Sequence, residues 1–520
     1  MRRGRLRTFA GVEPTLAPPP AARTRWPRPA HAWRRLESAW SARDRDEKTA
    51  LIGVAALLAG AIAVRAWLMI AYGPAFVGFA DSHDYLHAAA HGVFLGVEKP
   101  AGYPVFLDAV HFFSDQLSVT ILVQHALGVA TGLLLYTALR RTGAPAWLGL
   151  APAAVVFFGG TGLLLEHSLL ADSLFAFLQA AGVYAATRAL YGPELRWPAL
   201  AGVAIGASFW VRTVGLSSAV LVPVLLLAGA PGPVRRRLLS AATAAGAAAV
   251  VILGYVPVQA LATGYWGYQR ASAWNLYGRV ATFVDCSSFT PAPAIRFLCP
   301  PEPLGHRQGE NFFQYSSDSP AVARFGGPSR ASARDDALLW RFDLAAIEHE
   351  PLAYAGAILR SLSFYPFPRG GEGYTPEGFR EALLEPSGAT SIERPLAAYY
   401  ASARGYESSA GASVPLDSYE QATRIQGPLL IALLAAALAG TALAPGRARA
   451  VCALFTLTAI LSVAIAAAGN GYDARYGYPA YGPLAGGAAL GAWGVLRRLR
   501  RARRARRSRP LRGVCRRPSR

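Results

Sequence analysis

Two carboxylates and a lysine lie close together in the sequence between residues 78 and 107. Asp81 and Asp84 are three residues apart, so both would lie on one face of a helix. Lys99 is one of only two lysines in the chain, whose other basic residues are Arg. A carboxylate can accept a proton from a hydroxyl, and a cation can hold the negative charge of a departing phosphate. This stretch is therefore the first candidate for a catalytic site.

A structural role for Asp81 is the alternative. Residues 81–91 are expected to form a short helix at the membrane surface, and an acidic residue in its first turn suits the helix dipole. Asp81 would then be an N-cap, and Asn would replace it with little loss.

Long apolar segments would position this stretch. They are rich in Ala, Leu, Val and Gly, and each is about as long as a hydrocarbon layer of ~30 Å requires. We therefore predict an all-α, polytopic membrane protein with about ten transmembrane helices. The predicted spans are roughly 49–71, 117–139, 145–163, 169–190, 197–211, 214–229, 237–262, 426–444, 448–468 and 478–496.

The basic residues predict the orientation of these spans. The net charge is +21, and 25 of the 52 Lys and Arg residues lie in 1–48 and 497–520. Loops expected inside carry Arg, whereas loops expected outside carry acids, which follows the positive-inside rule. We therefore place both termini in the cytoplasm and assign the positive charge to the lipid bilayer surface rather than to nucleic acid. The Ala- and Arg-rich composition is typical of a high-GC bacterial genome, so the membrane would be a bacterial plasma membrane.

This topology divides the chain into five regions. Segment 263–424 is too long and too rich in aromatic, Pro and charged residues to be a simple loop, and apolar spacing predicts a helix within 333–362. The regions are a disordered basic tail (1–48), a membrane module of about seven spans (49–262) with a catalytic first outer loop (72–116), a mixed extracytoplasmic domain (263–424), three C-terminal spans (425–496) and a basic tail (497–520).

Cys286 and Cys299 lie in the extracytoplasmic segment, thirteen residues apart. On an oxidising face they predict a structural disulfide that closes a Pro-rich loop. Two unpaired thiols are the alternative. The other two cysteines are Cys452, in a span, and Cys515, in the C-terminal tail.

An enzyme on the outer side of this membrane has no nucleotide sugars. Its activated donor must be lipid-linked, typically a sugar on a polyprenyl phosphate. The departing phosphate needs cations rather than a general acid, and the acceptor hydroxyl needs one carboxylate base. A single attack from the far face inverts the anomeric carbon. Asp81 would be the base, and Lys99 would be a phosphate-binding cation.

The residues around Asp81 resemble a known family. The motif Asp-x-x-x-Tyr, which ends at Tyr85, is followed by Glu-Lys-Pro-x-x-Tyr-Pro, whose tyrosine is Tyr103. Together they are similar to the GT-C glycosyltransferase superfamily, most closely to its protein-mannosyltransferase and aminoarabinose-transferase-like branches and their actinobacterial members. The resemblance covers 49–262 and, through one motif, the last three spans.

The resemblance implies a role for each motif residue. Asp81 would be the catalytic Asp, and Lys99 would contact the carrier phosphate. Glu98 would help to hold a divalent metal ion, which is the one cofactor that the resemblance suggests. The tyrosines of the two motifs would support the site. Family members often have Asp-Glu in sequence, whereas Ser82 follows Asp81 here, so Asp84 is a second candidate base.

Three polar residues of the third and fourth spans are further candidates. Glu166 and His167 lie at the outer end of a predicted span, where similar family members carry acids near the donor site. Hydration of a span end is the alternative. Asp172 lies within an apolar run, and an acid there is costly and usually faces a polar interior.

Two arginines complete the set of candidate phosphate ligands. Arg212 lies between two short spans in an Arg-x-x-Gly step that family members often carry, although a snorkelling Arg is the alternative. Arg475 opens the last span in an Arg-Tyr-x-x-Pro step, and a guanidinium there can bind a phosphate through two hydrogen bonds. The alternative role of Arg475 is an ion pair with Asp473, two residues away.

The sequence therefore predicts a glycosyltransferase that moves a sugar from a polyprenyl phosphate to an external glycan, lipid or protein. A transporter or flippase of lipid-linked sugar is one alternative; it would bind the same phosphate but would need no base. A scaffold that binds cell-envelope partners is another, and it would not need Asp81. The sequence has no visible internal repeat of the kind common in transporters.

Overall fold

The computed structural model describes residues 40–41, 43–96, 99–370, 373–385, 392–401 and 414–507. The chain divides into two compact units, Met1–Lys48 and Thr49–Arg520. All candidate site residues lie in the second unit.

Every regular element within the described ranges is a helix, and β structure there is limited to an isolated bridge between Phe76 and Ser168. The predicted all-α class is confirmed, and each predicted apolar segment contains helix. The apolar helices are α2 (Arg45–Ala71), α5 (Leu117–Arg140), α6 (Leu150–Phe158), α7 (Gly160–Glu166), α8 (Asp172–Tyr191), α9 (Arg196–Val211), α10 (Leu216–Gly229), α11 (Val234–Thr263), α20 (Gly427–Leu443), α21 (Ala448–Gly469) and α22 (Tyr478–Arg507).

Five helical segments of the described chain are long and apolar enough to cross a membrane. They are α2, α5, α11, α21 and Pro415–Leu443, which contains α20. The bent pair Ala146–Phe158 and Gly160–Glu166 makes a sixth if it counts as one span. These segments indicate a multi-pass membrane protein. The total of about ten spans and the side of the membrane on which each loop lies stay predictions.

Two breaks interrupt the apolar segments. The predicted span 145–163 bends by 55° between α6 and α7, because Gly159 leaves the helical conformation with a ψ of 115°. At the next residue, Gly160, a Cβ atom would lie 2.6 Å from the Cα of Glu420, so only glycine permits this close approach. Arg212 is extended (φ −148°, ψ 129°) between α9 and the short turn η2 (Thr213–Gly215), where the sequence predicts a junction.

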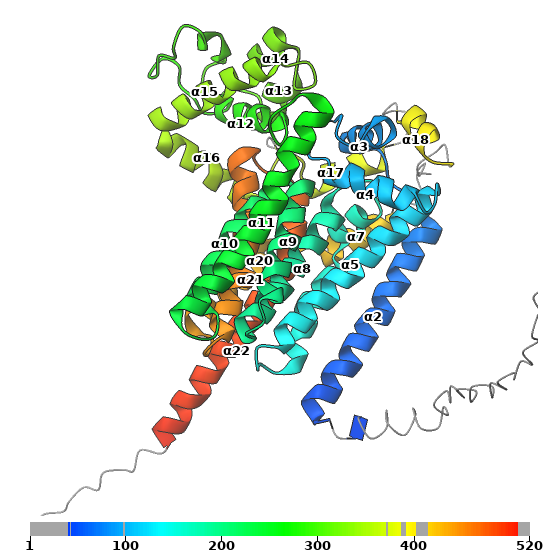
Figure 1. Ribbon diagram of the computed structural model, residues 1–520, viewed down its shortest axis with the longest axis vertical. Helices are drawn as coiled ribbons and strands as arrows, with labels where there is room; N and C mark the ends of the chain where they lie inside the picture. Colours follow the sequence, from blue (N-terminus) through cyan, green and yellow to red (C-terminus); the bar gives the residue numbers. More distant parts are fainter. Residues whose placement is uncertain are drawn as a thin grey trace, which may run out of the picture. The chain divides into compact units, whose positions relative to one another are not determined.

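Shorter helices gather at one end of the bundle that α5, α8–α11 and α20–α22 form by packing against one another (Figure 1). This end brings the predicted first outer loop and the predicted external segment together. The shorter helices are α3 (Ala80–His91), α4 (Gly102–His111), α12 (Ala271–Ala281), α13 (Glu310–Tyr315), α14 (Pro320–Phe325), α15 (Ala333–His349), α16 (Pro351–Ser363), α17 (Pro376–Leu384), α18 (Glu393–Tyr399) and α19 (Val414–Thr423).

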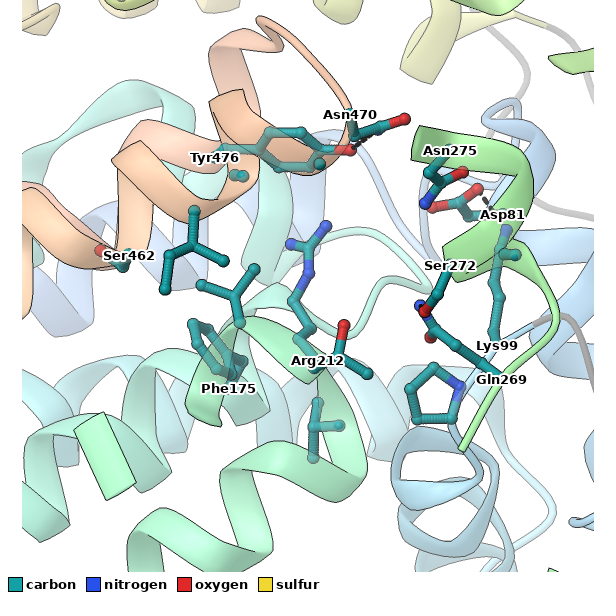
Figure 2. A pocket seen from close by; sticks show the side chains of 18 of the residues that line it. Asp81, Lys99, Phe175, Arg212, Gln269, Ser272, Asn275, Ser462, Asn470 and Tyr476 are labelled. Carbon is teal, nitrogen blue, oxygen red and sulfur yellow. Dashed lines mark hydrogen bonds and ion pairs between the residues drawn. The ribbon is translucent and has the colours of Figure 1, made fainter. Parts of the chain in front are cut away.

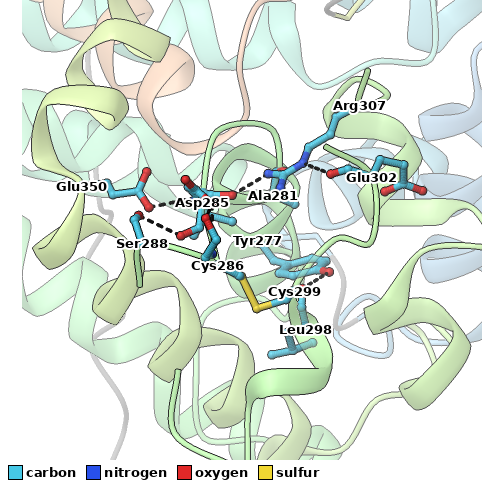
Figure 3. The surroundings of a disulfide bond; sticks show 12 residues. Tyr277, Ala281, Asp285, Cys286, Ser288, Leu298, Cys299, Glu302, Arg307 and Glu350 are labelled. Atoms are coloured by element: carbon cyan, nitrogen blue, oxygen red, sulfur yellow. Dashed lines mark hydrogen bonds between the residues drawn. A yellow bond between two sulfur atoms is a disulfide. The ribbon is translucent and has the colours of Figure 1, made fainter. Parts of the chain in front are cut away.

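The external segment has its own apolar core, in which α12 packs against α13 and α15. Cys286 and Cys299 form a disulfide beside this core, as the sequence predicts (Figure 3). The hydroxyl of Tyr277 donates to the Leu298 carbonyl at 2.9 Å, which ties the disulfide loop to α12. The predicted helix within 333–362 is confirmed as α15 and α16.

Candidate functional site

A cavity of about 290 Å³ lies where α3, the α9–α10 junction, α12 and the α21–α22 junction meet (Figure 2). It joins residues that are far apart in the sequence, from the first predicted outer loop to the last span. The described residues that line it include Asp81, Tyr85, Lys99, Pro100, Phe175, Arg212, Gln269, Ser272, Asn275, Tyr315, Trp340, Asn470, Arg475 and Tyr476.

Asp81 lies in the first turn of α3 and binds two cations. Its Oδ1 accepts a hydrogen bond from Lys99 Nζ, and its Oδ2 accepts one from Arg475 Nη1 at 2.7 Å. Phe79 is the N-cap of α3, without a side-chain hydrogen bond, so the alternative role of Asp81 as an N-cap is wrong. The carboxylate is directed instead into a cluster of charges, and its side chain is 17% exposed.

Lys99 joins the two candidate carboxylates of α3. Its Nζ also donates to Asp84 Oδ2 at 2.7 Å and lies 5.5 Å from the centre of the Tyr85 ring. Burial raises the pKa of Asp81, but the positive charges of Arg475 and Lys99 outweigh burial and leave that pKa well below its usual range. Asp81 is therefore ionised in this arrangement and is a weak proton acceptor while both cations hold it.

The short turn η5 (Ala474–Gly477), between α21 and α22, positions Arg475. Asp473 begins this turn, and its Oδ1 accepts a hydrogen bond from the backbone N–H of Arg475 at 3.0 Å. The guanidinium also lies 4.6 Å from the centre of the Phe79 ring. Burial raises the pKa of Asp473 to about 6, although the positive charge of Arg475 opposes the shift. Asp473 thus positions Arg475, and the guanidinium also remains directed at Asp81.

Arg212 contributes a third cation from the α9–α10 junction. It forms an ion pair with Asp172, the first residue of α8, whose side chain is 1% exposed. The Arg212 guanidinium lies 5.0 Å from the centre of the ring of Tyr476, the residue that follows Arg475 in the sequence. The structure therefore brings four predicted charged residues, Asp81, Lys99, Arg212 and Arg475, to one cavity, and Asp172 forms an ion pair with Arg212 behind them.

The other residues of the two motifs have different positions. Tyr85 lines the cavity, whereas Tyr103 is fully buried behind it, with ring centres 4.8 Å apart. The hydroxyl of Tyr103 donates to Gln124 Oε1 at 2.6 Å, which fastens the motif to α5. Glu98, the predicted metal ligand, lies outside the described residues.

Glu166 and His167 do not line the cavity. Glu166 is fully buried, and its two oxygens accept hydrogen bonds from Arg65 of α2, each at 2.8 Å. His125 of α5 lies 3.0 Å from the same carboxylate and 3.1 Å from His167 Nδ1. A side chain at Gly128 would overlap the carboxylate, so glycine leaves room for it. This buried cluster links α2, α5 and α7, and it is neither a hydrated span end nor part of the cavity wall.

Several polar residues of the cavity wall were not predicted. Those of the external segment include Gln269, just before α12, Ser272 and Asn275 in the first turns of α12, and Trp340 on α15. No local motif marks them, because their position depends on how the external domain packs against the bundle.

The donor groups around Asp81 favour an anion over a metal ion. Asp81 and Asp84 both bind the ammonium of Lys99, which fills the place between the two carboxylates where a cation would be held. No group of three or more His, Cys, Asp or Glu side chains within the described ranges is arranged to hold a metal ion. The three cations of the cavity are the ligands that a phosphate would require.

No protein-family model and no curated protein matches the sequence. Among solved structures, the chain is similar to a protein O-mannosyltransferase complex from S. cerevisiae bound to the sugar donor, with 16% identity over 49% of this chain and 37% of that one and a TM-score of 0.30. It is also similar to the oligosaccharyltransferase AglB from Archaeoglobus fulgidus in complex with an inhibitory peptide and a dolichol-phosphate, with 13% identity, 88% and 52% coverage and a TM-score of 0.44.

A third similar structure is ArnT from Cupriavidus metallidurans bound to undecaprenyl phosphate, with 16% identity over 87% of this chain and 79% of that one and a TM-score of 0.31. The chain spans 37% and 52% of the lengths of the first two proteins.

Proposed function

We propose that the protein is a GT-C-type glycosyltransferase, which moves a sugar from a polyprenyl phosphate to an external hydroxyl acceptor with inversion. The observation that carries this proposal is the convergence of one carboxylate, Asp81, and three cations, Lys99, Arg212 and Arg475, on a single cavity. The departing phosphate needs the cations, and the acceptor hydroxyl needs the carboxylate.

The cations would hold the phosphate of the donor. As the bond between the anomeric carbon and the phosphate oxygen breaks, its electron pair stays on that oxygen, and the phosphate becomes a monoester with more negative charge. Lys99 and Arg475 would stabilise this charge at the moment when it develops. Arg212 is held by Asp172 and would contribute mainly positive potential.

Donor binding would also make Asp81 available as a base, because the phosphate would bind the same two cations. A bound phosphate would compete with Asp81 for Lys99 and Arg475, and the loss of those partners would raise the pKa of the carboxyl. Asp81 would then take the proton of the acceptor hydroxyl while the hydroxyl oxygen bonds to the anomeric carbon. Donor binding would therefore precede activation of the acceptor.

Transfer of labelled sugar in proteoliposomes tests this function. Protein would be supplied with a polyprenyl phosphate that carries a radiolabelled sugar, together with bacterial membranes as the acceptor source. We expect release of free polyprenyl phosphate and a product with the opposite anomeric configuration. A flippase would move the label across the bilayer with its phosphate bond intact, and a scaffold would produce neither change; either result would overturn the proposal.

A further inference from the structure

The cavity has two walls of different chemistry. The charged residues among its described lining are Asp81, Lys99, Arg212 and Arg475, and they come from the membrane module and the last helix junction. The described lining residues of the external segment carry amide, hydroxyl and aromatic groups, and none of them is charged. The close-up of the cavity shows this neutral wall, with Gln269, Ser272 and Asn275 on one side near Lys99 and Asp81 (Figure 2).

Gln269, just before α12, and Ser272 and Asn275, in its first turns, form the polar part of the neutral wall. Ser272 and Asn275 are three residues apart, so they share a helix face. Gln269 Nε2 donates to Ser272 Oγ at 3.0 Å, which orients both side chains. The amide of Asn275 lines the cavity and, within the part of the chain that the structure describes, has no hydrogen-bond partner. Its donor and acceptor groups are therefore available to a ligand.

The opposite face of α12 holds this wall in place. Trp274 and Tyr277 are fully buried in the external core, and Trp274 Nε1 donates to Asp336 at 3.2 Å. A side chain on Gly278 would lie 2.6 Å from the side chain of Gln314 of α13, so the two helices are in close contact. A rigid backbone of this kind suits a site that selects a ligand by hydrogen-bond geometry.

Trp340 adds an aromatic surface to the neutral wall. It lies on α15, is 39% exposed and lines the cavity. The apolar C–H face of a sugar ring packs well on an indole ring, while its hydroxyls need amide and hydroxyl partners at the ring edge. A wall that combines Asn275 and Ser272 with Trp340 offers both kinds of contact.

The neutral wall also disfavours charged sugars. An ammonium or a carboxylate on a sugar would lose water against this wall without an opposite charge to replace it, and such burial is costly. Asp81 already binds Lys99 and Arg475, and these groups would act on the phosphate and the acceptor proton.

We propose that the neutral wall, defined as Gln269, Ser272, Asn275 and Trp340, binds a neutral sugar ring and makes the enzyme select neutral over amino or acidic sugars. The proposal rests on the proposed glycosyltransferase function and deepens it by naming the substrate class. The ring belongs either to the donor or to the acceptor, and the two sources give different kinetic results.

The test uses the full-length protein in lipid nanodiscs and three variants. Asn275→Ala removes the free amide, Trp340→Ala removes the aromatic face, and Trp340→Phe keeps part of it. Asn311→Ala is the matched control, because Asn311 is an exposed asparagine on α13 of the same external segment. The ligands are polyprenyl phosphate without sugar, a neutral polyprenyl phosphohexose, and its amino-sugar and uronic-acid counterparts.

If the wall binds the donor sugar, the unmodified protein is expected to bind the neutral phosphohexose at least tenfold more tightly than either charged counterpart. If the ring belongs to the donor, Asn275→Ala and Trp340→Ala weaken phosphohexose binding by about tenfold each and leave polyprenyl phosphate binding unchanged. If it belongs to the acceptor, donor affinity is unchanged, and the quantity of acceptor membranes needed for half-maximal transfer rises by a similar factor. Trp340→Phe should recover part of either loss.

Equal or tighter binding of a charged sugar donor, together with an acceptor saturation that Asn275→Ala and Trp340→Ala leave unchanged, would overturn the proposal. So would unchanged donor affinity together with unchanged acceptor saturation in Asn275→Ala and Trp340→Ala. These results are distinct from a failure of the glycosyltransferase function, in which the unmodified protein would release no polyprenyl phosphate from any of the sugar donors.

Discussion

Two of the charged clusters among the described residues, one around Asp81 and one around Glu166, differ in their access to the candidate cavity. Asp81, with Lys99 and Arg475, lines the cavity and has a side chain that is 17% exposed. Glu166, with Arg65 and His125, is fully buried between α2, α5 and α7. Both clusters contain a carboxylate that binds more than one partner, so hydrogen bonding does not distinguish them.

The difference between the clusters lies in what a substrate could reach. The carboxylate of the cavity cluster is held by cations that a phosphate could take over, whereas the carboxylate of the buried cluster is held by groups inside the helix bundle. A charged residue in an apolar segment therefore indicates that it faces polar groups inside the protein. It is a candidate catalytic residue only where it also lines a cavity that a substrate can enter. The two clusters should respond to substitution in different ways.

The largest effect is expected from Asp81→Asn. Asn keeps the size of the side chain but cannot take the acceptor proton, so turnover should fall by ~10²–10⁴. The folded protein should still bind the lipid-linked donor, because Lys99 and Arg475 remain. Transfer rates and donor affinity, measured on the same preparation, check this prediction.

Asp318→Asn is the matched control for that experiment, because Asp318 is an exposed aspartate of the external segment. It should transfer sugar at the unmodified rate. A stable Asp81→Asn protein with normal turnover would remove Asp81 as the base, and Asp84, which binds the same lysine, would be tested next.

Glu166→Gln should act on stability rather than on chemistry. It leaves the buried Arg65 without its counter-charge, and breaking a buried ion pair costs about 3–5 kcal/mol. We expect a lower thermal unfolding temperature in nanodiscs and an unchanged donor affinity for the protein that stays folded. Glu348→Gln, at an exposed position of α15, serves as the control. Loss of donor binding at unchanged stability would show that the buried cluster takes part in donor binding, which contradicts the distinction between the two clusters.

Arg475→Ala should combine a smaller loss of rate with a loss of affinity. The guanidinium would bind the phosphate in the donor and more strongly as negative charge develops, so donor affinity should fall about 10- to 100-fold and the rate should fall as well. Arg475→Lys should recover only part of the loss, because an ammonium cannot make two parallel hydrogen bonds. Full recovery by Lys would show that charge alone matters. Isothermal titration with the donor, followed by single-turnover transfer, separates the two effects.

Much of the cavity cluster could be predicted from the sequence. Asp81 and Lys99 are close in the chain, their types suit one reaction, and the motif that contains them resembles a known family. Arg475 lies almost four hundred residues away, yet its Arg-Tyr-x-x-Pro step and its place at the outer end of a predicted span made it a candidate.

The buried cluster and the neutral wall could not be predicted in the same way. Glu166 was a site candidate because of its place at a span end, but its partner Arg65 lies in another apolar segment and only packing brings the two together. Arg65 is a charged residue within an apolar run, and such a residue indicates a polar partner inside the protein. Asn275 and Trp340 have ordinary surroundings in the sequence, and their role depends on the docking of α12 and α15 at the cavity.

The affinity of Asp81→Asn for polyprenyl phosphate tests the central claim most directly. If the carboxylate and a phosphate compete for Lys99 and Arg475, removal of the carboxylate charge should tighten the binding of polyprenyl phosphate by about tenfold, even as turnover is lost. Titration of both proteins with polyprenyl phosphate in nanodiscs gives the ratio. An affinity that is unchanged or weaker in Asp81→Asn would contradict the claim that donor phosphate and catalytic base share these two cations.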